Sequence, residues 1–223
     1  MRWRHEWKHE IGPADAIVIR QRMGVVGMLD PHARDGCYGI RSVYFDNGAD
    51  KALREKLDGV DKRQKWRIRL YDGDASLIHL ERKSKQHDLG TKDSCELTAE
   101  EAQSIVDGNT SWMAFDKRPL VRALAADMAC LGLRPRTIVD YVREPFIYPA
   151  GNVRVTIDRN IRTGLASTDF LNPQVPTVPV PGDPIILEVK WDDFLPSVVR
   201  DAVQLGARRT TSFSKYAICR SYD

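Results

Sequence analysis

The sequence predicts an α+β fold in which antiparallel strands close into an eight-stranded β-tunnel, a closed barrel with covering helices. One observation is that several short segments alternate charged and apolar residues with period two, which is the pattern of strands. Another is that helical segments lie between these strands at irregular intervals, which argues against a parallel, doubly wound sheet. The length fits a single domain over residues 1–223.

In each expected strand, successive side chains point to opposite faces of the sheet. The first, Trp3–Ile11, places Arg4, Glu6, Lys8 and Glu10 on one face. The other strands are expected at Tyr38–Asp46, Trp66–Tyr71, Leu77–Lys85, Thr137–Pro145, Val153–Asn160, Ile185–Trp191 and Ser214–Arg220.

Helix starts are marked by prolines and by one capping pattern. Pro13, Pro119 and Pro196 each precede apolar residues at helical spacing, and proline is favoured in the first turn of a helix. Thr98 and Glu101 form a capping box, in which each side chain accepts a hydrogen bond from the other residue's backbone. These helices are expected to cover the apolar faces of the strands.

Composition limits the classes of function. The hydrophobic fraction of 42% supports a real core, and the net charge is only +3 despite 34 Lys and Arg, which argues against a globally basic nucleic-acid binder. Neither glycine-rich nucleotide-binding motif occurs. With no apolar leader and no run near the roughly 20 apolar residues that span a bilayer, a soluble cytoplasmic protein is expected.

The distribution of charge over the strands points to an anion-binding interior. Arg67 and Arg69 share one face of their strand, opposite Trp66, Ile68 and Leu70. One interpretation is an ordinary sheet with a solvated charged face. However, the charged faces are strongly basic and the apolar faces need the helices as cover, which favours a barrel with the charges inside. Such cations need a polyanion, and a linear chain of phosphates suits arginine forks and lysine point charges.

Nine short motifs follow one another along nearly the whole chain. They are Arg4-x-Glu6-x-Lys8, Ser42–Asp46, Lys56–Val60, Arg67–Tyr71, Leu80–Lys83, Tyr141–Arg143, Val153–Asp158, Leu187–Lys190 and Phe213–Tyr216. Each motif is weak by itself. In this order they resemble the VTC (vacuolar transporter chaperone) polyphosphate polymerase domain, within the wider group of triphosphate tunnel metalloenzymes.

The resemblance implies a divalent metal, Mn²⁺ or Mg²⁺, and transfer of the terminal phosphate of ATP to a growing chain of inorganic polyphosphate. It assigns Glu188 to the metal, and Glu6 and Glu81 to support of the basic side chains. The catalytic, phosphate-binding residues that it implies are Lys8, Arg67, Arg69, Lys83, Arg143, Arg154 and Lys215, with Lys92 and Lys190 as further phosphate contacts.

One position departs from the wider group. Hydrolytic members begin with Glu-x-Glu-x-Lys, and Arg4 stands here in place of the first acid. Since a two-metal hydrolase needs clustered carboxylates, polymerisation or binding of polyphosphate is favoured. Asp192 and Asp193 could be a second pair of metal ligands, but a solvated turn is the favoured interpretation.

Several alternatives stay open at this point. A metal-dependent tripolyphosphatase or nucleoside triphosphatase and a non-catalytic polyphosphate-binding module are the competing functions. A nucleic-acid partner is not expected, because few aromatic residues interleave the basic ones. A separate membrane partner is possible, and the oligomeric state is open.

Overall fold

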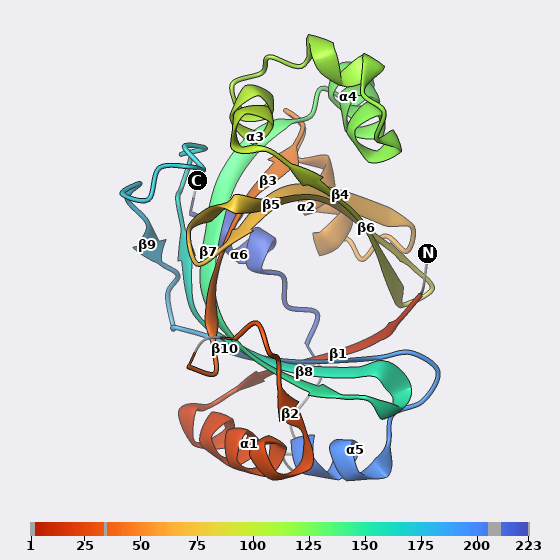
Figure 1. Cartoon of the computed structure of the whole chain (residues 1–223), viewed down its shortest axis with the longest axis vertical. Helices are drawn as coiled ribbons and strands as arrows, with labels where there is room; N and C mark the ends of the chain where they lie inside the picture. The colour runs from red at the N-terminus through yellow and green to blue at the C-terminus, as the bar shows by residue number, and fades with distance from the viewer. Residues whose placement is uncertain (1–2, 34, 205–210, 223) are drawn as a thin grey trace.

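The computed structural model describes residues 3–33, 35–204 and 211–222. Its centre is one antiparallel sheet that curls on itself (Figure 1). Eight strands follow one another around the sheet in the order β1 (His5–Ile11), β10 (Ile185–Trp191), β8 (Val153–Thr163), β7 (Arg134–Tyr148), β3 (Tyr38–Asp46), β4 (Arg63–Tyr71), β5 (Asp74–Gln86) and β6 (Leu89–Leu97). Two short strands, β2 (Met28–Leu29) and β9 (Val178–Pro179), pair with β7 and β8.

The two edges of the sheet, β1 and β6, meet at one place. Arg4, just before β1, forms an isolated antiparallel bridge with Gly90 of β6. The two backbone N–H···O distances of this bridge are 2.9 and 3.0 Å. The predicted α+β class and antiparallel sheet are therefore confirmed as a curled half-barrel, while full closure into a tunnel stays a prediction.

Helices cover both outer faces of the curled sheet (Figure 1). Below it, α1 (Pro13–Val26) and α5 (Ser197–Val203) pack on β8 and β10, burying Ile19 and Met23 against Val155 and Val189. Above it, α3 (Ala99–Val106), the short 3₁₀ helix η1 (Ser111–Phe115) and α4 (Pro119–Leu131) bury the apolar face of β4 and β5. The charged face of each strand is thus left on the concave side. Among the helices of the described ranges, none combines the length and apolar character that a bilayer span needs.

The last predicted strand is wrong, because Ser214–Arg220 contains the helix α6 (Lys215–Arg220). The Ser214 side chain caps this helix by accepting a hydrogen bond from the backbone N–H of Ala217. Tyr216 and Cys219, three residues apart, are its buried residues. Tyr216 stacks on Tyr44 at 5.1 Å between ring centroids, so α6 lies on the concave side of the sheet.

Besides short elements such as β2, β9 and η1, strand β6 and helix α2 (Lys51–Leu57) had no recognisable signal in the sequence. Strand β6 follows β5 through His87 and Asp88, which both have positive φ (48° and 61°), a tight-turn geometry usually supplied by Asn-Gly. Helix α2 buries none of its residues completely. It is anchored instead by the Asp46 carboxylate, which accepts hydrogen bonds from the backbone N–H groups of Ala52 and Leu53. The capping box of Thr98 and Glu101, by contrast, is confirmed.

We predict that Gly151→Ala destabilises the turn between β7 and β8. Gly151 has φ +72°, and an added Cβ would overlap the backbone carbonyl of Phe194. The free energy of unfolding should fall by about 1–3 kcal/mol, measured by urea denaturation. The control is Gly24→Ala within α1, where nothing lies within 4 Å of the new Cβ, and where stability should rise by roughly 0.5–1 kcal/mol. Equal effects of the two changes would contradict the prediction.

Candidate functional site

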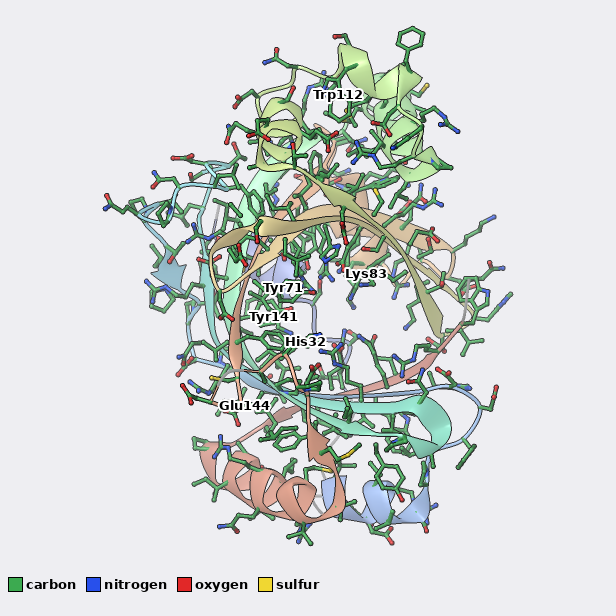
Figure 2. The ribbon with its side chains drawn as sticks, viewed as in Figure 1. His32, Tyr71, Lys83, Trp112, Tyr141 and Glu144 are labelled. Atoms are coloured by element: carbon green, nitrogen blue, oxygen red, sulfur yellow. The ribbon has the colours of Figure 1, made fainter. Side chains whose placement is uncertain are left out.

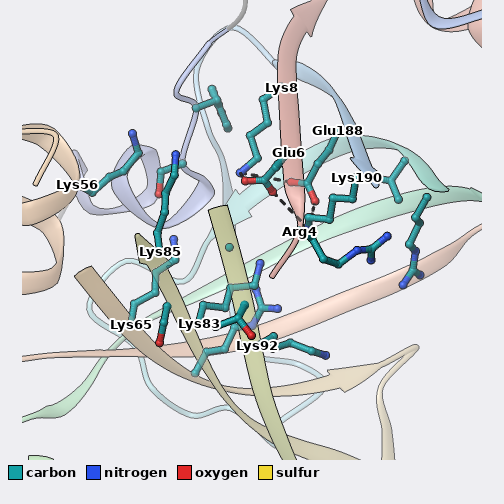
Figure 3. Close-up of a pocket in the computed structure, with 18 of the residues that line it drawn as sticks. Arg4, Glu6, Lys8, Lys56, Lys65, Lys83, Lys85, Lys92, Glu188 and Lys190 are labelled. Carbon is teal, nitrogen blue, oxygen red and sulfur yellow. Dashed lines mark ion pairs between the residues drawn. The ribbon is translucent and has the colours of Figure 1, made fainter. Parts of the chain in front are cut away.

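The concave side of the sheet encloses a cavity of about 500 Å³ (Figure 3). Thirteen lysine and arginine side chains line it, against three carboxylates, those of Glu6, Asp88 and Glu188. Strands β1, β4, β5, β6, β7, β8 and β10 all contribute cations to it, as does α2. In the lining, basic side chains thus outnumber acidic ones by ten, while Glu81, Asp158, Asp30 and Asp192, which are not part of the lining, pair with some of them.

Most residues predicted for the site lie together in this cavity. Glu81 and Lys215 do not line the cavity themselves. Glu81 binds Arg67, which does, and Lys215 binds Asp158, the partner of Arg143. The predicted residues in the lining are Glu6, Lys8, Arg67, Arg69, Lys83, Lys92, Arg143, Arg154, Glu188 and Lys190. The structure thus brings the set together, while their functional roles stay predictions.

Arg67 and Arg69 are fixed by buried partners on the concave face of β4. The Arg67 Nε donates to Glu81 Oε2 at 2.6 Å, and its Nη1 donates to the Tyr44 hydroxyl at 2.9 Å. Arg69 donates to the Ser42 hydroxyl at 3.1 Å and to the Tyr141 hydroxyl at 2.9 Å. Both arginines are only 4% exposed. Burial opposes ionisation of Glu81, but the charges of Arg67, Arg69 and Lys92 outweigh it and hold the Glu81 pKa well below its usual range.

Asp158 is a functional candidate that the sequence analysis did not single out. It lies directly opposite Arg143 in the register of β7 and β8 and accepts from Arg143 Nε and Nη2 at 2.7 and 2.8 Å. It also accepts from Lys215 Nζ at 2.6 Å. Burial favours the neutral acid, but the charges of Arg143 and Lys215 prevail and lower the Asp158 pKa to about 2. The alternation from Arg154 through Thr156 could have revealed it.

Two carboxylates and two lysines form a second charged cluster, on β1 and β10. The register places Lys8 opposite Glu188, and Glu6 opposite Lys190. Lys8 Nζ lies 3.3 Å from Glu6 and 3.4 Å from Glu188, and Lys190 contacts both acids as well (Figure 3). Burial opposes ionisation of both acids, and the charge of Glu188 also opposes ionisation of Glu6. The nearby lysines, with Arg143 in the case of Glu188, outweigh these effects and lower both pKa values.

Arg4 does not reach into an acidic metal site. Its Nε forms an ion pair with Asp192 Oδ1 at 2.9 Å, and its Nη2 donates to the backbone carbonyl of Asn152. Asp192 is only 6% exposed and also accepts from the Asn152 amide at 3.1 Å, so the favoured interpretation of Asp192 as part of a solvated turn is wrong. This network ties the ends of β10 and β8 to the bridge that joins the sheet edges.

The comparison with protein families decides the assignment, since the model of the VTC domain matches residues 3–222. The chain belongs to the VTC domain family. The resemblance seen in the nine motifs is thus confirmed. Among curated proteins, no sequence matches the chain.

Two solved structures share the fold of this VTC domain. One is a protein from Bacillus halodurans provisionally named an adenylate cyclase, with 11% identity and a TM-score of 0.51 over 84% of this chain and 81% of that one. The other is the PH1012 protein of Pyrococcus horikoshii OT3, with 12% identity and a TM-score of 0.52 over 96% and 98% of the two chains. At these identities, the similarity is one of fold.

Lys65 is a residue of the VTC domain cavity that the sequence analysis missed, because the expected strand began one residue later. It lies on the same face as Arg67 and sits 5.6 Å above the Tyr44 ring. Among the described residues, no carboxylate forms an ion pair with Lys65 or Lys83. The two lysines face each other across β4 and β5, and Lys92 stands opposite Lys83 on β6. Like charges in such positions destabilise a sheet unless an anion lies between them.

Divalent metal ligands are limited in this cavity. No cluster of three or more His, Cys, Asp and Glu side chains occurs in the described part of the chain. Glu6 and Glu188 are a pair of acids in its lining, and both contact Lys8. Two carboxylates suffice for Mg²⁺ or Mn²⁺ where substrate phosphates and water complete the coordination, so these residues fit a metal that arrives with its nucleotide.

We predict that Glu81→Gln destabilises the fold. The change leaves Arg67 buried without its carboxylate, and the free energy of unfolding should fall by about 3–5 kcal/mol in chemical denaturation. The control is Asp93→Asn, which removes the partner of Arg82 on the neighbouring strand. That ion pair is partly exposed, so its loss should lower stability by less than about 1 kcal/mol. Similar losses in both variants would show that Glu81 is no special anchor.

Anion binding should take up protons above pH 8. Burial and the charges of Lys8 and Arg67 lower the pKa of Lys65 to about 8. Burial disfavours the Tyr44 phenolate, but Arg67 and Lys65 outweigh it and lower its pKa to about 8 as well. A bound polyanion favours the ammonium and the neutral phenol, so it raises both pKa values and its affinity should fall as pH rises above that value.

Calorimetry in buffers of different ionisation enthalpy measures this uptake. Tripolyphosphate binding should take up protons at about pH 9 and far fewer at about pH 6.5. Lys65→Met should remove much of the uptake at the higher pH, whereas exposed Lys117→Met should not change it. Proton release on binding would have the opposite sign and refute the assignment.

Proposed function

We propose that this VTC domain is a metal-dependent phosphotransferase that moves the terminal phosphate of ATP to a growing polyphosphate chain. The observation that carries the proposal is the lining of one cavity, in which basic side chains outnumber acidic ones by ten and several are buried and fixed. A closed tunnel around a linear anion, formed by residues 1–223 as one domain, is the arrangement under which these charges would be balanced. Family membership supports the same substrate class.

The wall of β4 and β7 suits the reacting phosphates. Arg67, Arg69 and Arg143 are held before any ligand binds, and a fixed guanidinium can donate two parallel hydrogen bonds to a phosphate. Phosphoryl transfer depends mainly on positioning and on neutralising charge, which such a wall provides. Arg154, held by Asp30 at 3.0 Å, extends it along β8.

The chemistry needs no general base from the protein. An ionised terminal oxygen of the polyphosphate would attack the γ-phosphorus of ATP, and the bond between this phosphorus and the oxygen that bridges it to the β-phosphate would break. ADP would be released, and the polyphosphate would be one phosphate longer. Arg67, Arg69 and Lys83 would hold the transferred group, and Lys8, Lys92, Lys190 and Lys215 would bind or steady neighbouring phosphates. A divalent metal held by Glu188 and Glu6 would neutralise charge on the triphosphate.

Arg4 bears on the choice between polymerase and hydrolase. Its guanidinium is occupied by Asp192 and Asn152, and it adds a positive charge where hydrolytic tunnel proteins have an acid. Glu6 and Glu188 are the pair of acids that share Lys8, and the carboxylates for a second metal beside them are lacking in the described lining. Polyphosphate synthesis is therefore favoured over hydrolysis of tripolyphosphate.

The test is incubation of purified protein with ATP and Mn²⁺, followed by a gel that resolves polyphosphate lengths. A ladder of chains is expected, and Lys83→Ala and Glu188→Gln should slow its formation by roughly 10²–10³-fold, the effect of removing one electrostatic contact to the reacting group. Lys83 is chosen because its removal spares the buried ion pairs. Exposed Lys117→Ala is the control and should leave the rate unchanged.

Other products would redirect the assignment. Orthophosphate released from tripolyphosphate, without a ladder, would identify a hydrolase. Tight binding of polyphosphate without any product would identify a binding module.

A further inference from the structure

The basic lining continues beyond the residues assigned to phosphoryl transfer. Arg63 is the first residue of β4, and the register places Lys85 of β5 directly opposite it. Lys56, in the last turn of α2, lines the same cavity although α2 is not part of the sheet. All three side chains line one cavity, and partial burial together with the charges of Arg63, Lys8 and Lys85 lowers the Lys56 pKa. We call Lys56, Arg63 and Lys85 the α2 cluster.

The α2 cluster is poorly neutralised by the protein. Among the described residues, no acid forms an ion pair with Lys56 or Arg63. Lys85 lies 3.1 Å from Asp88, but that side chain is 98% exposed, where an ion pair contributes little. Some directly opposed residues on the concave face are of opposite charge, as in Arg67 with Glu81, whereas Lys65 and Lys83 are opposed with like charges. The like charges of Arg63 and Lys85 extend the pattern of Lys65 and Lys83, and like charges in these positions call for an external anion.

The α2 cluster is continuous with the interior. Arg63 stands two residues before Lys65 on β4, and Lys85 stands two residues after Lys83 on β5. All four side chains lie on the same face of the sheet. Two residues of a strand span about 7 Å, so a linear anion bound between Lys65 and Lys83 reaches the cluster by extending a few phosphates further. A tripolyphosphate held by the arginines of β4 has no phosphates left to do so.

The side chains of the α2 cluster differ in kind from the interior wall. Arg67 and Arg143 are buried and fixed by carboxylates. Lys56 and Lys85 are half-buried lysines, flexible point charges that accept a phosphate from many directions. Both are labelled in Figure 3, where they reach into the same cavity as Lys8 and Glu6. Such a pair suits a chain that moves past it more than a group held for reaction.

We infer that the α2 cluster binds the part of a linear polyphosphate that extends beyond the transfer site, and thereby makes the protein select long chains over tripolyphosphate. This inference rests on the proposed function, because it takes the occupant of the interior to be a chain of phosphates. It adds a site, α2 with the start of β4 and the end of β5, and a dependence of affinity on chain length.

The double variant Lys56→Ala/Lys85→Ala tests the inference in the full chain. Its affinity for long-chain polyphosphate should fall by about tenfold, the loss of two partly exposed charge contacts, and the salt dependence of that affinity should weaken. Its affinity for tripolyphosphate should not change. The matched control is Lys117→Ala/Arg200→Ala, which removes two exposed positive charges outside the cavity and should leave both affinities as in the wild type.

The outcomes separate this inference from the proposed function. If the double variant loses affinity equally for both ligands, or for neither, the α2 cluster is not a chain-length site. The proposed function would still stand in that case, provided that the wild type binds tripolyphosphate. The same loss for a single-stranded oligonucleotide as for polyphosphate would overturn selectivity for phosphate chains. A wild-type protein that binds neither phosphate ligand would overturn both.

Discussion

Opposite charges that face each other across neighbouring strands are the interaction on which the concave side of the sheet depends. Lys8 pairs with Glu188, Arg143 with Asp158 and Arg67 with Glu81, each at directly opposed positions in the register. A guanidinium buried without a carboxylate would cost several kcal/mol, so these pairs allow so many cations to share one small space. Because register aligns them, a slip of one strand by one residue would carry one partner of each pair to the opposite face and separate it from the other.

The helices explain why the charges are inside at all. Apolar residues on the outer faces of β4, β5, β8 and β10 are covered by α3 and α4 on one side and by α1 and α5 on the other. Once those faces are buried, alternation leaves the charged residues only the concave side. The basic cavity is therefore a consequence of where the hydrophobic effect places the helices. The carboxylates on the same strands offset the cost of burying its cations.

The alternation of charged and apolar residues predicted seven strands, and it placed Arg67 and Arg69 on one face. These strands are β1, β3, β4, β5, β7, β8 and β10. It did not predict β6, because His87-Asp88 is not a typical tight-turn sequence. It also predicted a strand over the residues that form α6. Lys65 was lost by starting β4 late. The role of Asp158 depends on its position opposite Arg143, which is a property of the register and not of either segment alone.

The fixed arginines also have an entropic consequence. Arg67, Arg69 and Arg143 lose their rotamer freedom when the protein folds, because Glu81, Ser42 and Asp158 already hold them. A ligand that meets them therefore need not immobilise them, which favours tight and accurately placed binding. Among the described residues no carboxylate pairs with Lys65 or Lys83, so a ligand that binds them must still immobilise their side chains. The cavity thus combines arginines that are fixed before a ligand binds with lysines that can adjust to a ligand as it binds.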